Sequence, residues 1–232
     1  MSDGNARSLA QIHLLSDLNE QELERLEQAC SWKTYDAQEQ IIDRQSETRD
    51  VFFVVSGAAR VVIYSLSGRE ITLDDVNAGG HFGDLAAIDG APRSASVMAL
   101  KDTTIASLSQ ERFLQLLSEN FDVTLRLMKS LALIVRTSTD RIMDLSTLAA
   151  NNRVQADLLR LARNNMVGEN RAELVPIPVH GDIASRVSTT RETVARVLSD
   201  LSRQGVVERL KDRLVIDDVD HLEDMVEEVR GE

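Results

Sequence analysis

The sequence predicts an α+β protein in which an antiparallel β-roll is followed by a long helix and a small winged helix-turn-helix domain. Short β-rich runs broken by glycines occupy about residues 31–108. Glycine is then absent until Gly168, and apolar residues recur at helical spacing. The last third holds two short helical patterns and two short strand patterns. We expect three parts: a β-roll domain at residues 1–120, a long helix at residues 121–150 and a winged helix-turn-helix domain at residues 151–232.

The N-terminal region is predicted to begin with short helices and to continue as a roll of strands. Asn19 precedes an acidic turn and then Leu23 and Leu26, which is typical of a capped helix. Several short strands with turns at regular spacing favour an antiparallel sandwich or barrel. The expected strands are Val51–Val55, Ala59–Tyr64, Glu70–Val76, Ala95–Ala99 and Thr103–Leu108.

A coiled-coil seam is predicted for the long helix. Apolar and small residues follow one another at steps of four and three. They are Thr124, Met128, Leu131, Val135, Ser138, Ile142, Leu145 and Ala149. This spacing favours pairing with a second copy of the helix over packing on the chain's own sandwich. Ser138 is a polar residue in the middle of the seam, with Thr139 beside it, and it needs a partner from the opposite helix or from a ligand. Asn151-Asn152 follows as an expected hinge.

The charge of the chain is distributed unevenly. The formal net charge is −12, which on average disfavours a partner made of phosphates. Residues 186–213, however, carry seven basic and four acidic residues, a local charge of +3. The tail from Leu214 to Glu232 carries one basic and eight acidic residues, a local charge of −7, and is predicted to be a short strand and an acidic helix. The basic segment is therefore the candidate contact with nucleic acid.

Residues 182–204, which overlap the basic segment, have the spacing of a helix-turn-helix. Ile183, Ala184 and Val187 predict a first helix, hydroxyl residues predict a turn, and Val194 to Leu201 predict a second helix that ends at Gly205. The start of the second helix would enter the major groove, with Arg191 and Arg196 donating to guanine and Glu192 accepting from cytosine. Thr189, Thr190 and Thr193 would hold phosphates. The alternative is a solvated amphipathic helix with Glu192 and Arg196 as an ordinary ion pair.

Two short strands after the second helix predict a wing. Val206–Arg209 and Arg213–Ile216 flank a charged tip. Arg209, Lys211 and Arg213 would then meet the phosphate backbone.

Several classes of protein are disfavoured. A single cysteine, Cys30, excludes a disulfide framework and clusters held by several thiolates. The longest apolar runs are five residues, and Met1 to Asn5 has no signal-peptide pattern, so we expect a cytoplasmic protein without a membrane partner. One histidine in the roll, His81, argues against a metal-dependent jelly-roll enzyme and against a haem site. Because no nucleophile has a recognisable setting, we expect neither catalysis nor a bound metal.

The winged region resembles that of the CRP/FNR superfamily of transcription regulators. The Arg-Glu-Thr-Val run at Arg191–Val194 and the following Arg196 match the start of the family's recognition helix. The resemblance implies that Arg191, Glu192 and Arg196 read a TGTGA-like half-site within a pseudo-palindrome. Ser188 stands where a helix-turn-helix commonly has glycine with a positive φ, which implies a small strain.

The segment Gly79–Ala95 resembles the phosphate-binding cassette of the same family. The resemblance therefore implies a cyclic-nucleotide-binding β-roll. Gly83 would let the backbone approach a cyclic phosphate, the amides of Leu85 and Ala86 would point at it, and Arg93 with Ser94 would neutralise and bind it. Asp84 would take the ribose hydroxyl. Without the other two domains, a plain structural hairpin would be the better interpretation.

The resemblance also places Ser138 and Thr139 at the family's adenine contact, where the seam had already singled out Ser138. The sequence departs from the family at two points: Asp84 replaces glutamate, and Ile134 stands where the family has the arginine that partners it. Cyclic AMP is the first expectation for the effector and cyclic GMP the second. A cyclic dinucleotide, or no nucleotide at all, remains an alternative. FNR-type oxygen sensing is excluded by the single cysteine.

These inferences combine into a ligand-responsive homodimeric regulator that binds double-stranded DNA. Its effector would bias the paired helices and thereby set the spacing of the two recognition helices. RNA polymerase is an expected partner if the protein is an activator. The alternative is a cyclic-nucleotide-binding regulatory module that acts on a protein partner.

Overall fold

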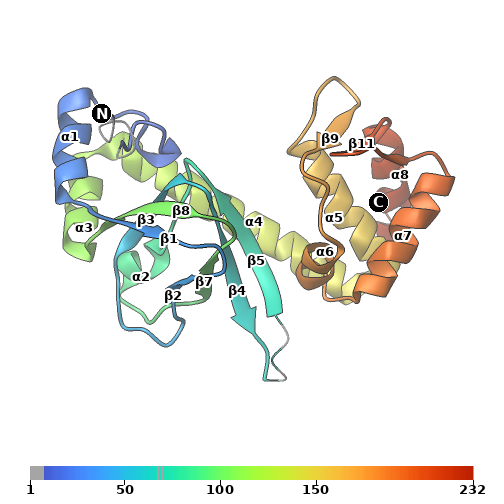
Figure 1. The fold of residues 1–232 in the computed structure, drawn as a ribbon, viewed down its shortest axis with the longest axis horizontal. Helices are drawn as coiled ribbons and strands as arrows, with labels where there is room; N and C mark the ends of the chain where they lie inside the picture. The colour runs from blue at the N-terminus through green and yellow to red at the C-terminus, as the bar shows by residue number, and fades with distance from the viewer. Residues whose placement is uncertain (1–7, 67, 69, 232) are drawn as a thin grey trace. The chain divides into compact units, whose positions relative to one another are not determined.

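The computed structural model describes residues 8–66, 68 and 70–231, and the chain forms two compact units. The units are Met1–Ile134 and Val135–Glu232. Helix α4 (Phe121–Thr147) contributes residues to both of them (Figure 1). The expected turn residue Ser67, the start Met1 to Asn5 and the final Glu232 lie outside the described residues.

The first unit contains the predicted antiparallel roll as two four-stranded sheets, ordered β1-β8-β3-β6 and β2-β7-β4-β5. All five predicted strands are confirmed; β1, β2 and the two-residue β6 were not individually predicted. The strands are β1 Ser31–Tyr35, β2 Gln40–Ile42, β3 Val51–Ser56, β4 Ala58–Tyr64, β5 Glu70–Asn77, β6 His81–Phe82, β7 Ser96–Ala99 and β8 Thr103–Leu108.

Strand β3 forms the centre of this unit. All five residues from Val51 to Val55 are buried, because one face packs against the helices and the other against the second sheet. Such two-sided burial explains a continuous apolar run in place of alternation. Phe53 lies in the cluster shared with the helices, and Phe52 stacks on Phe82 with ring centroids 5.2 Å apart in the other cluster.

Helices close one side of the roll. The 3₁₀ helix η1 spans His13–Leu15, α1 spans Glu20–Ala29, α2 spans Asp84–Asp89 and α3 spans Gln110–Glu119. The predicted cap of α1 is confirmed as a reciprocal capping box between Asn19 and Glu22. Phe113 of α3 is fully buried in the same cluster as Phe53.

Helix α4 changes character along its length. Near its start, Val123 and Leu127 are buried in the core of the first unit. Further on, apolar seam residues are exposed in a single copy of the chain, with Val135 65% and Ile142 63% accessible. Ser138 and Thr139 on the same stretch are also exposed. A contiguous row of apolar side chains exposed to water is uncommon on the surface of a single chain.

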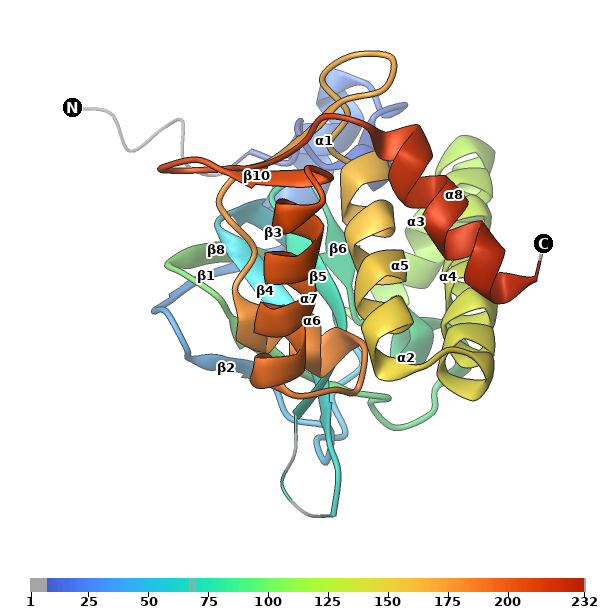
Figure 2. The same ribbon diagram turned by 90° about the vertical axis from the view of Figure 1, so that its right-hand side faces the viewer.

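The second unit is a helical domain with a small sheet. It consists of α5 Ala150–Arg163, β9 Ala172–Leu174, α6 His180–Arg186, α7 Arg191–Arg203, β10 Val207–Arg209, β11 Leu214–Ile216 and α8 Val219–Arg230. The sheet has the order β10-β11-β9. Within this unit α5 packs against both α7 and α8 and lies between them (Figure 2). The predicted helix-turn-helix, wing and acidic helix are confirmed, and β9 is an unpredicted third strand.

The break between α4 and α5 does not lie where the asparagines suggested. The helix ends at Thr147 and resumes at Ala150, so Asn151 and Asn152 belong to the first turn of α5. The break falls at Leu148 and Ala149 because the Leu148 side chain turns into the core of the second unit, where it is 5% exposed. The expectation of a hinge at Asn151-Asn152 was therefore wrong by about one turn.

No helix in the described part of the chain is both long and apolar enough to cross a membrane.

The turn between β3 and β4 requires glycine. Gly57 has φ +88°, and a Cβ there would lie 2.4 Å from Thr103 Oγ1 and 2.5 Å from the Asp102 carbonyl oxygen. Gly57→Ala should therefore lower the free energy of unfolding of the first unit by about 3 kcal/mol, the sum of backbone strain and overpacking. The fluorescence of Trp32, the single tryptophan, measures this in a denaturant titration.

Gly90→Ala is the matched control. Gly90 also has a positive φ, but a Cβ there would meet nothing within 4 Å. Gly90→Ala should lower the free energy of unfolding by about 1 kcal/mol, through backbone strain alone. Equal costs at the two positions would contradict the steric argument.

Candidate functional site

The cassette predicted at Gly79–Ala95 forms a tight turn followed by the short helix α2. Gly83 precedes α2 with φ +84°. A Cβ at Gly83 would lie 2.8 Å from Arg93 Nη1 and 2.9 Å from the Asp50 carbonyl oxygen. Glycine is therefore required here both for backbone conformation and for close approach.

Arg93 is the structural centre of this cassette and is 4% exposed. Its guanidinium donates to the carbonyl oxygens of Gly83 at 3.0 Å and Asp50 at 2.9 Å, and to Thr48 Oγ1 at 3.3 Å. Burial lowers the pKa of Arg93, and the carboxylates of Asp50 and Asp84 act in the opposite direction. The buried guanidinium thus joins the β2–β3 loop to the cassette and lies in the field of two carboxylates.

The other predicted ligand residues of the cassette differ in accessibility. Asp84 and Ala86 are buried, whereas Leu85 is 43% exposed and Ser94 is exposed. The structure therefore brings Gly83, Asp84 and Arg93 together in the interior of the cassette and presents Leu85 and Ser94 on its surface. Ser138 and Thr139 lie on α4 within the second unit, where Thr139 Oγ1 donates to the Val135 carbonyl oxygen at 2.9 Å.

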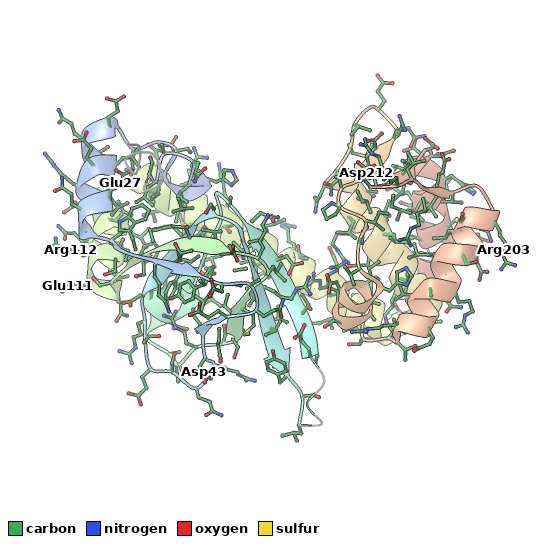
Figure 3. All side chains as sticks on the ribbon, viewed as in Figure 1. Glu27, Asp43, Glu111, Arg112, Arg203 and Asp212 are labelled. Atoms are coloured by element: carbon green, nitrogen blue, oxygen red, sulfur yellow. The ribbon has the colours of Figure 1, made fainter. Side chains whose placement is uncertain are left out.

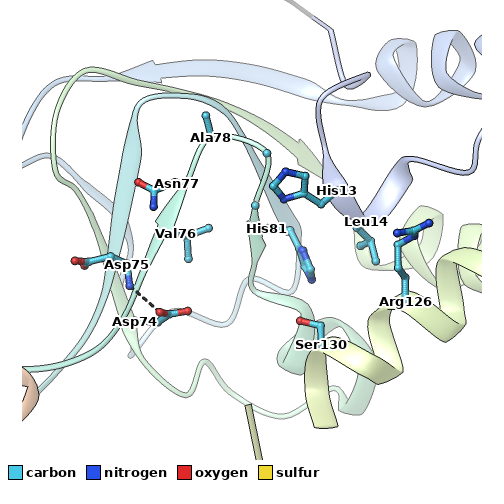
Figure 4. A pocket seen from close by; sticks show the side chains of 12 residues that line it. His13, Leu14, Asp74, Asp75, Val76, Asn77, Ala78, His81, Arg126 and Ser130 are labelled. Atoms are coloured by element: carbon cyan, nitrogen blue, oxygen red, sulfur yellow. Dashed lines mark hydrogen bonds between the residues drawn. The ribbon is translucent and has the colours of Figure 1, made fainter. Parts of the chain in front are cut away.

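A hollow of about 380 Å³ lies beside the cassette in the first unit. It is bounded by η1, the end of β5, the Gly79-Gly80 turn, β6 and the start of α4, and His13 and His81 both line it (Figure 4). The hollow was not predicted from the sequence, which offered only an isolated histidine in the roll. Burial lowers the pKa of His81; Asp84 raises it and His13 lowers it further.

The helix-turn-helix is built as the sequence predicted. Helices α6 and α7 pack together through a short turn, and Ser188 has φ +52°, which confirms the expected positive φ at a non-glycine residue. Thr190 caps α7, because its Oγ1 accepts from the Thr193 backbone N–H at 3.2 Å. Thr190 and Thr193 are therefore part of the helix cap, and Thr189 lies in the turn before it.

The three predicted base-reading side chains lie on the exposed face of the first turns of α7. Arg191, Glu192 and Arg196 are all exposed. The Arg191 guanidinium packs against Gly181 of α6, where a Cβ would lie 3.0 Å from its Nε. Arg196 Nη2 donates to Asn151 Oδ1 at 3.3 Å. The pKa of Glu192 is lowered mainly by a hydrogen bond from its own backbone amide and, second, by a hydrogen bond from the Thr190 hydroxyl.

The basic residues of this region are not equivalent. Arg209 and Lys211 on the wing are exposed. Arg213 instead pairs with Asp212, at the wing tip labelled in Figure 3, and with Glu173 at 2.6 Å; these carboxylates raise its pKa. Arg186 is only partly exposed and pairs with the buried Asp157 at 2.9 Å. Because Arg186 and Arg213 are paired with carboxylates, residues 186–213 offer less positive charge to a partner than their composition indicated.

Buried charged residues behind the helix-turn-helix were not found by sequence reasoning. Asp144 and Asp157 are 6% and 2% exposed. Arg153 donates to the carbonyl oxygens of Leu148, Val187 and Ser188. Asp157 was detectable in principle, because it stands among Val154, Leu158 and Leu161 on the apolar face of its helix.

Comparison with known proteins matches both units. The cyclic nucleotide-binding domain family matches residues 32–120, and the Crp-like helix-turn-helix domain family matches residues 152–225. The chain is 35% identical over 157 residues to the cyclic AMP receptor protein of Thermus thermophilus, an alignment that covers 68% of this chain and 70% of that protein.

Solved structures have the same fold. A mutant CooA from Carboxydothermus hydrogenoformans superposes with a TM-score of 0.80, at 24% identity, over 97% of each chain. The c-di-GMP responsive global regulator CLP of Xanthomonas campestris superposes with a TM-score of 0.66, at 20% identity, over 83% of this chain and 96% of that one.

A β-roll of the cyclic nucleotide-binding domain family, joined by a long helix to a Crp-like winged helix-turn-helix, defines a cyclic nucleotide-binding transcription regulator with a DNA-binding domain. More particularly, the chain belongs to the CRP/FNR family. Among residues 8–66, 68 and 70–231, no three histidine, cysteine, aspartate or glutamate side chains are grouped so as to hold a metal ion.

The lowered pKa of His81 makes the stability of the first unit depend on pH. In the unfolded chain the imidazole takes up a proton near pH 6.5, whereas the folded chain resists protonation. The unfolded state therefore binds more protons below that pH, and stability falls as the pH falls. Between about pH 7.5 and pH 5 this loss should reach at most about 1.4 kcal/mol per pH unit.

His81→Gln should remove this dependence. Denaturant titrations followed by Trp32 fluorescence at several pH values measure it, and His221→Gln, on the exposed surface of α8, should keep the wild-type pH profile. If the free energy of unfolding of His81→Gln falls with pH as steeply as that of wild type, the pH dependence does not come from His81.

Proposed function

We propose that the protein is a homodimeric transcription regulator in which a cyclic nucleotide, bound at the cassette, controls the placement of two recognition helices on DNA. The observation that carries this proposal is the cassette itself: Gly83, Asp84 and Arg93 converge in its interior. A guanidinium beside a close-approaching glycine suits a cyclic phosphate. Leu85, Ala86 and Ser94 complete the proposed phosphate contacts, and Ser138 and Thr139 the base contact.

Cyclic AMP is the first candidate for the effector. The Thermus thermophilus relative is a cyclic AMP receptor protein, and this supports the choice. Asp84 is one methylene shorter than glutamate, and Ile134 supplies no cation to pair with it, so the ribose contact has changed. Cyclic GMP is the second candidate. The CLP neighbour responds to c-di-GMP, which keeps a cyclic dinucleotide among the alternatives.

Pairing of α4 with a second copy is supported by the exposed apolar row along it. A dimer would bury Val135 and Ile142, both of which lie in water in the single chain. It would also present two copies of α7, as a pseudo-palindromic TGTGA-like site requires. RNA polymerase is a proposed partner if the protein activates transcription.

Thermal-shift measurements test the effector. Cyclic AMP at about one hundred times its Kd should raise Tm by about 5 °C or more, and cyclic GMP and cyclic di-GMP are measured beside it. Arg93→Ala should abolish the ligand-induced shift, because the guanidinium is the main cation of the cassette. Arg112→Ala, on the exposed surface of α3, should keep it. A shift of wild-type size in Arg93→Ala would refute the proposed phosphate site.

Binding to a palindromic TGTGA-like duplex tests the output and separates a DNA-binding regulator from a module that acts on a protein partner. Arg191→Ala should weaken binding by about 1–3 kcal/mol and relax base preference. Arg203→Ala, at the far end of α7 and already paired with Asp200, should have little effect. Affinity should fall as the salt concentration rises. No preference for the palindrome over random sequence would favour the protein-partner alternative.

Arg213 offers a further test within the same titration. Its charge is balanced by Asp212 and Glu173, so Arg213→Ala should weaken DNA binding less than Lys211→Ala, whose side chain is exposed. Titration of both variants at two salt concentrations measures the difference. The reverse order would show that the ion pairs of Arg213 open on DNA.

A further inference from the structure

Two carboxylates are buried in the second unit, where charge is costly unless it is paired. Asp144 lies in the last turn of α4 and Asp157 in the middle of α5, with 6% and 2% of their surfaces exposed. An ionised carboxylate in such a place needs cations and hydrogen bonds around it. Both have them, and the cations come from three different helices.

Asp157 joins α5 to the first helix of the helix-turn-helix. Arg186 of α6 donates through Nε at 3.0 Å and through Nη2 at 2.9 Å to Asp157 Oδ2. Arg160 Nη1 donates to Asp157 Oδ1 at 3.0 Å. A planar guanidinium that makes two bonds to one carboxylate fixes orientation as well as distance.

Asp144 joins the end of α4 to the C-terminal helix. Arg230 of α8 donates through Nη2 at 2.7 Å and through Nε at 3.2 Å to Asp144 Oδ1. Arg160 Nη2 reaches Asp144 Oδ2 at 3.5 Å, so a single arginine contacts both buried carboxylates. The resulting chain of ion pairs runs from α8 through α4 and α5 to α6.

The break between α4 and α5 is held by a second set of bonds. Arg153 donates to the Leu148 carbonyl oxygen at 2.9 Å, to that of Val187 at 2.9 Å and to that of Ser188 at 3.2 Å. One side chain thus ties the break to the turn of the helix-turn-helix. These bonds hold the backbone of the break against the turn of the helix-turn-helix.

We propose that Asp144 and Asp157, held by Arg160, Arg186 and Arg230, are positioning residues that join the last turn of α4 rigidly to the helix-turn-helix. The DNA-binding unit then turns together with the end of α4, and any flexing occurs in the exposed part of the helix before Asp144. Helix α8 holds the last turn of α4 in place through the ion pair of Arg230 with Asp144. The consequence for DNA binding rests on the function proposed above.

Hydrogen exchange of the full chain tests the local part of the proposal without DNA or nucleotide. In Arg230→Gln and in Asp144→Asn, amides of residues 144–149 should exchange about tenfold faster than in wild type. The amides in the middle of α5 should keep their wild-type rates. Arg230→Gln is the milder variant, because Asp144 keeps its ion pair with Arg160.

Arg163→Gln is the matched control. Arg163 also links α5 to α8, through Glu223, but this pair lies on the surface and does not reach α4. It should leave exchange at residues 144–149 unchanged. Unchanged exchange there in Arg230→Gln and Asp144→Asn, or an equal increase throughout the second unit, would overturn the proposal in favour of a general contribution to stability.

DNA binding tests the positioning consequence. The full chain is titrated with a duplex of two TGTGA-like half-sites and with the same duplex after one half-site is scrambled. Arg230→Gln should reduce the preference for the two-site duplex about tenfold and leave half-site affinity close to wild type. Equal weakening on both duplexes would refute a positioning role. If wild type binds neither duplex specifically, the proposed function fails, while the exchange result still decides the local claim.

Discussion

The interaction on which both units depend is an arginine guanidinium, buried or partly buried, that donates hydrogen bonds to groups distant from it in the chain. Arg93 donates to the backbone of two loops in the first unit. Arg153 does the same for the α4–α5 break and the helix-turn-helix turn. Arg186 joins α6 to α5 through the buried carboxylate of Asp157. Arginine suits this role because its planar fork makes several directed bonds and it keeps its proton when buried.

This use of arginine changes how the charge of the protein is interpreted. The basic segment at residues 186–213 stands out in a chain of net charge −12. Yet Arg186 lies inside the fold, and Arg213 is balanced by Asp212 and Glu173. The cations left for a phosphate backbone are few, so we infer that affinity for DNA depends on the base-reading side chains and on the geometry of two recognition helices more than on bulk attraction.

The parts predicted well from the sequence are those with local causes. Strand β3, the capping box of Asn19 and Glu22, the long helix and both helices of the helix-turn-helix follow from periodicity and capping. Ser188 was identified as strained from its place in the turn, and its φ is positive. The break after α4 was misplaced because asparagine is only a weak breaker, whereas burial of Leu148 is a tertiary effect. The hollow between His13 and His81 joins residues 68 positions apart, which periodicity cannot relate.

The sequence alone determined the order of the three parts, the exposed seam of α4, the basic segment and the glycines of the cassette, since each of these is written in neighbouring residues. Tertiary structure decided which charged side chains are paired inside the fold and which remain exposed to solvent. Asp144 meets Arg230 across 86 positions, and Arg93 meets Asp50 across 43. Pairings at such separations are selected by packing and desolvation, and neither leaves a local pattern in the sequence.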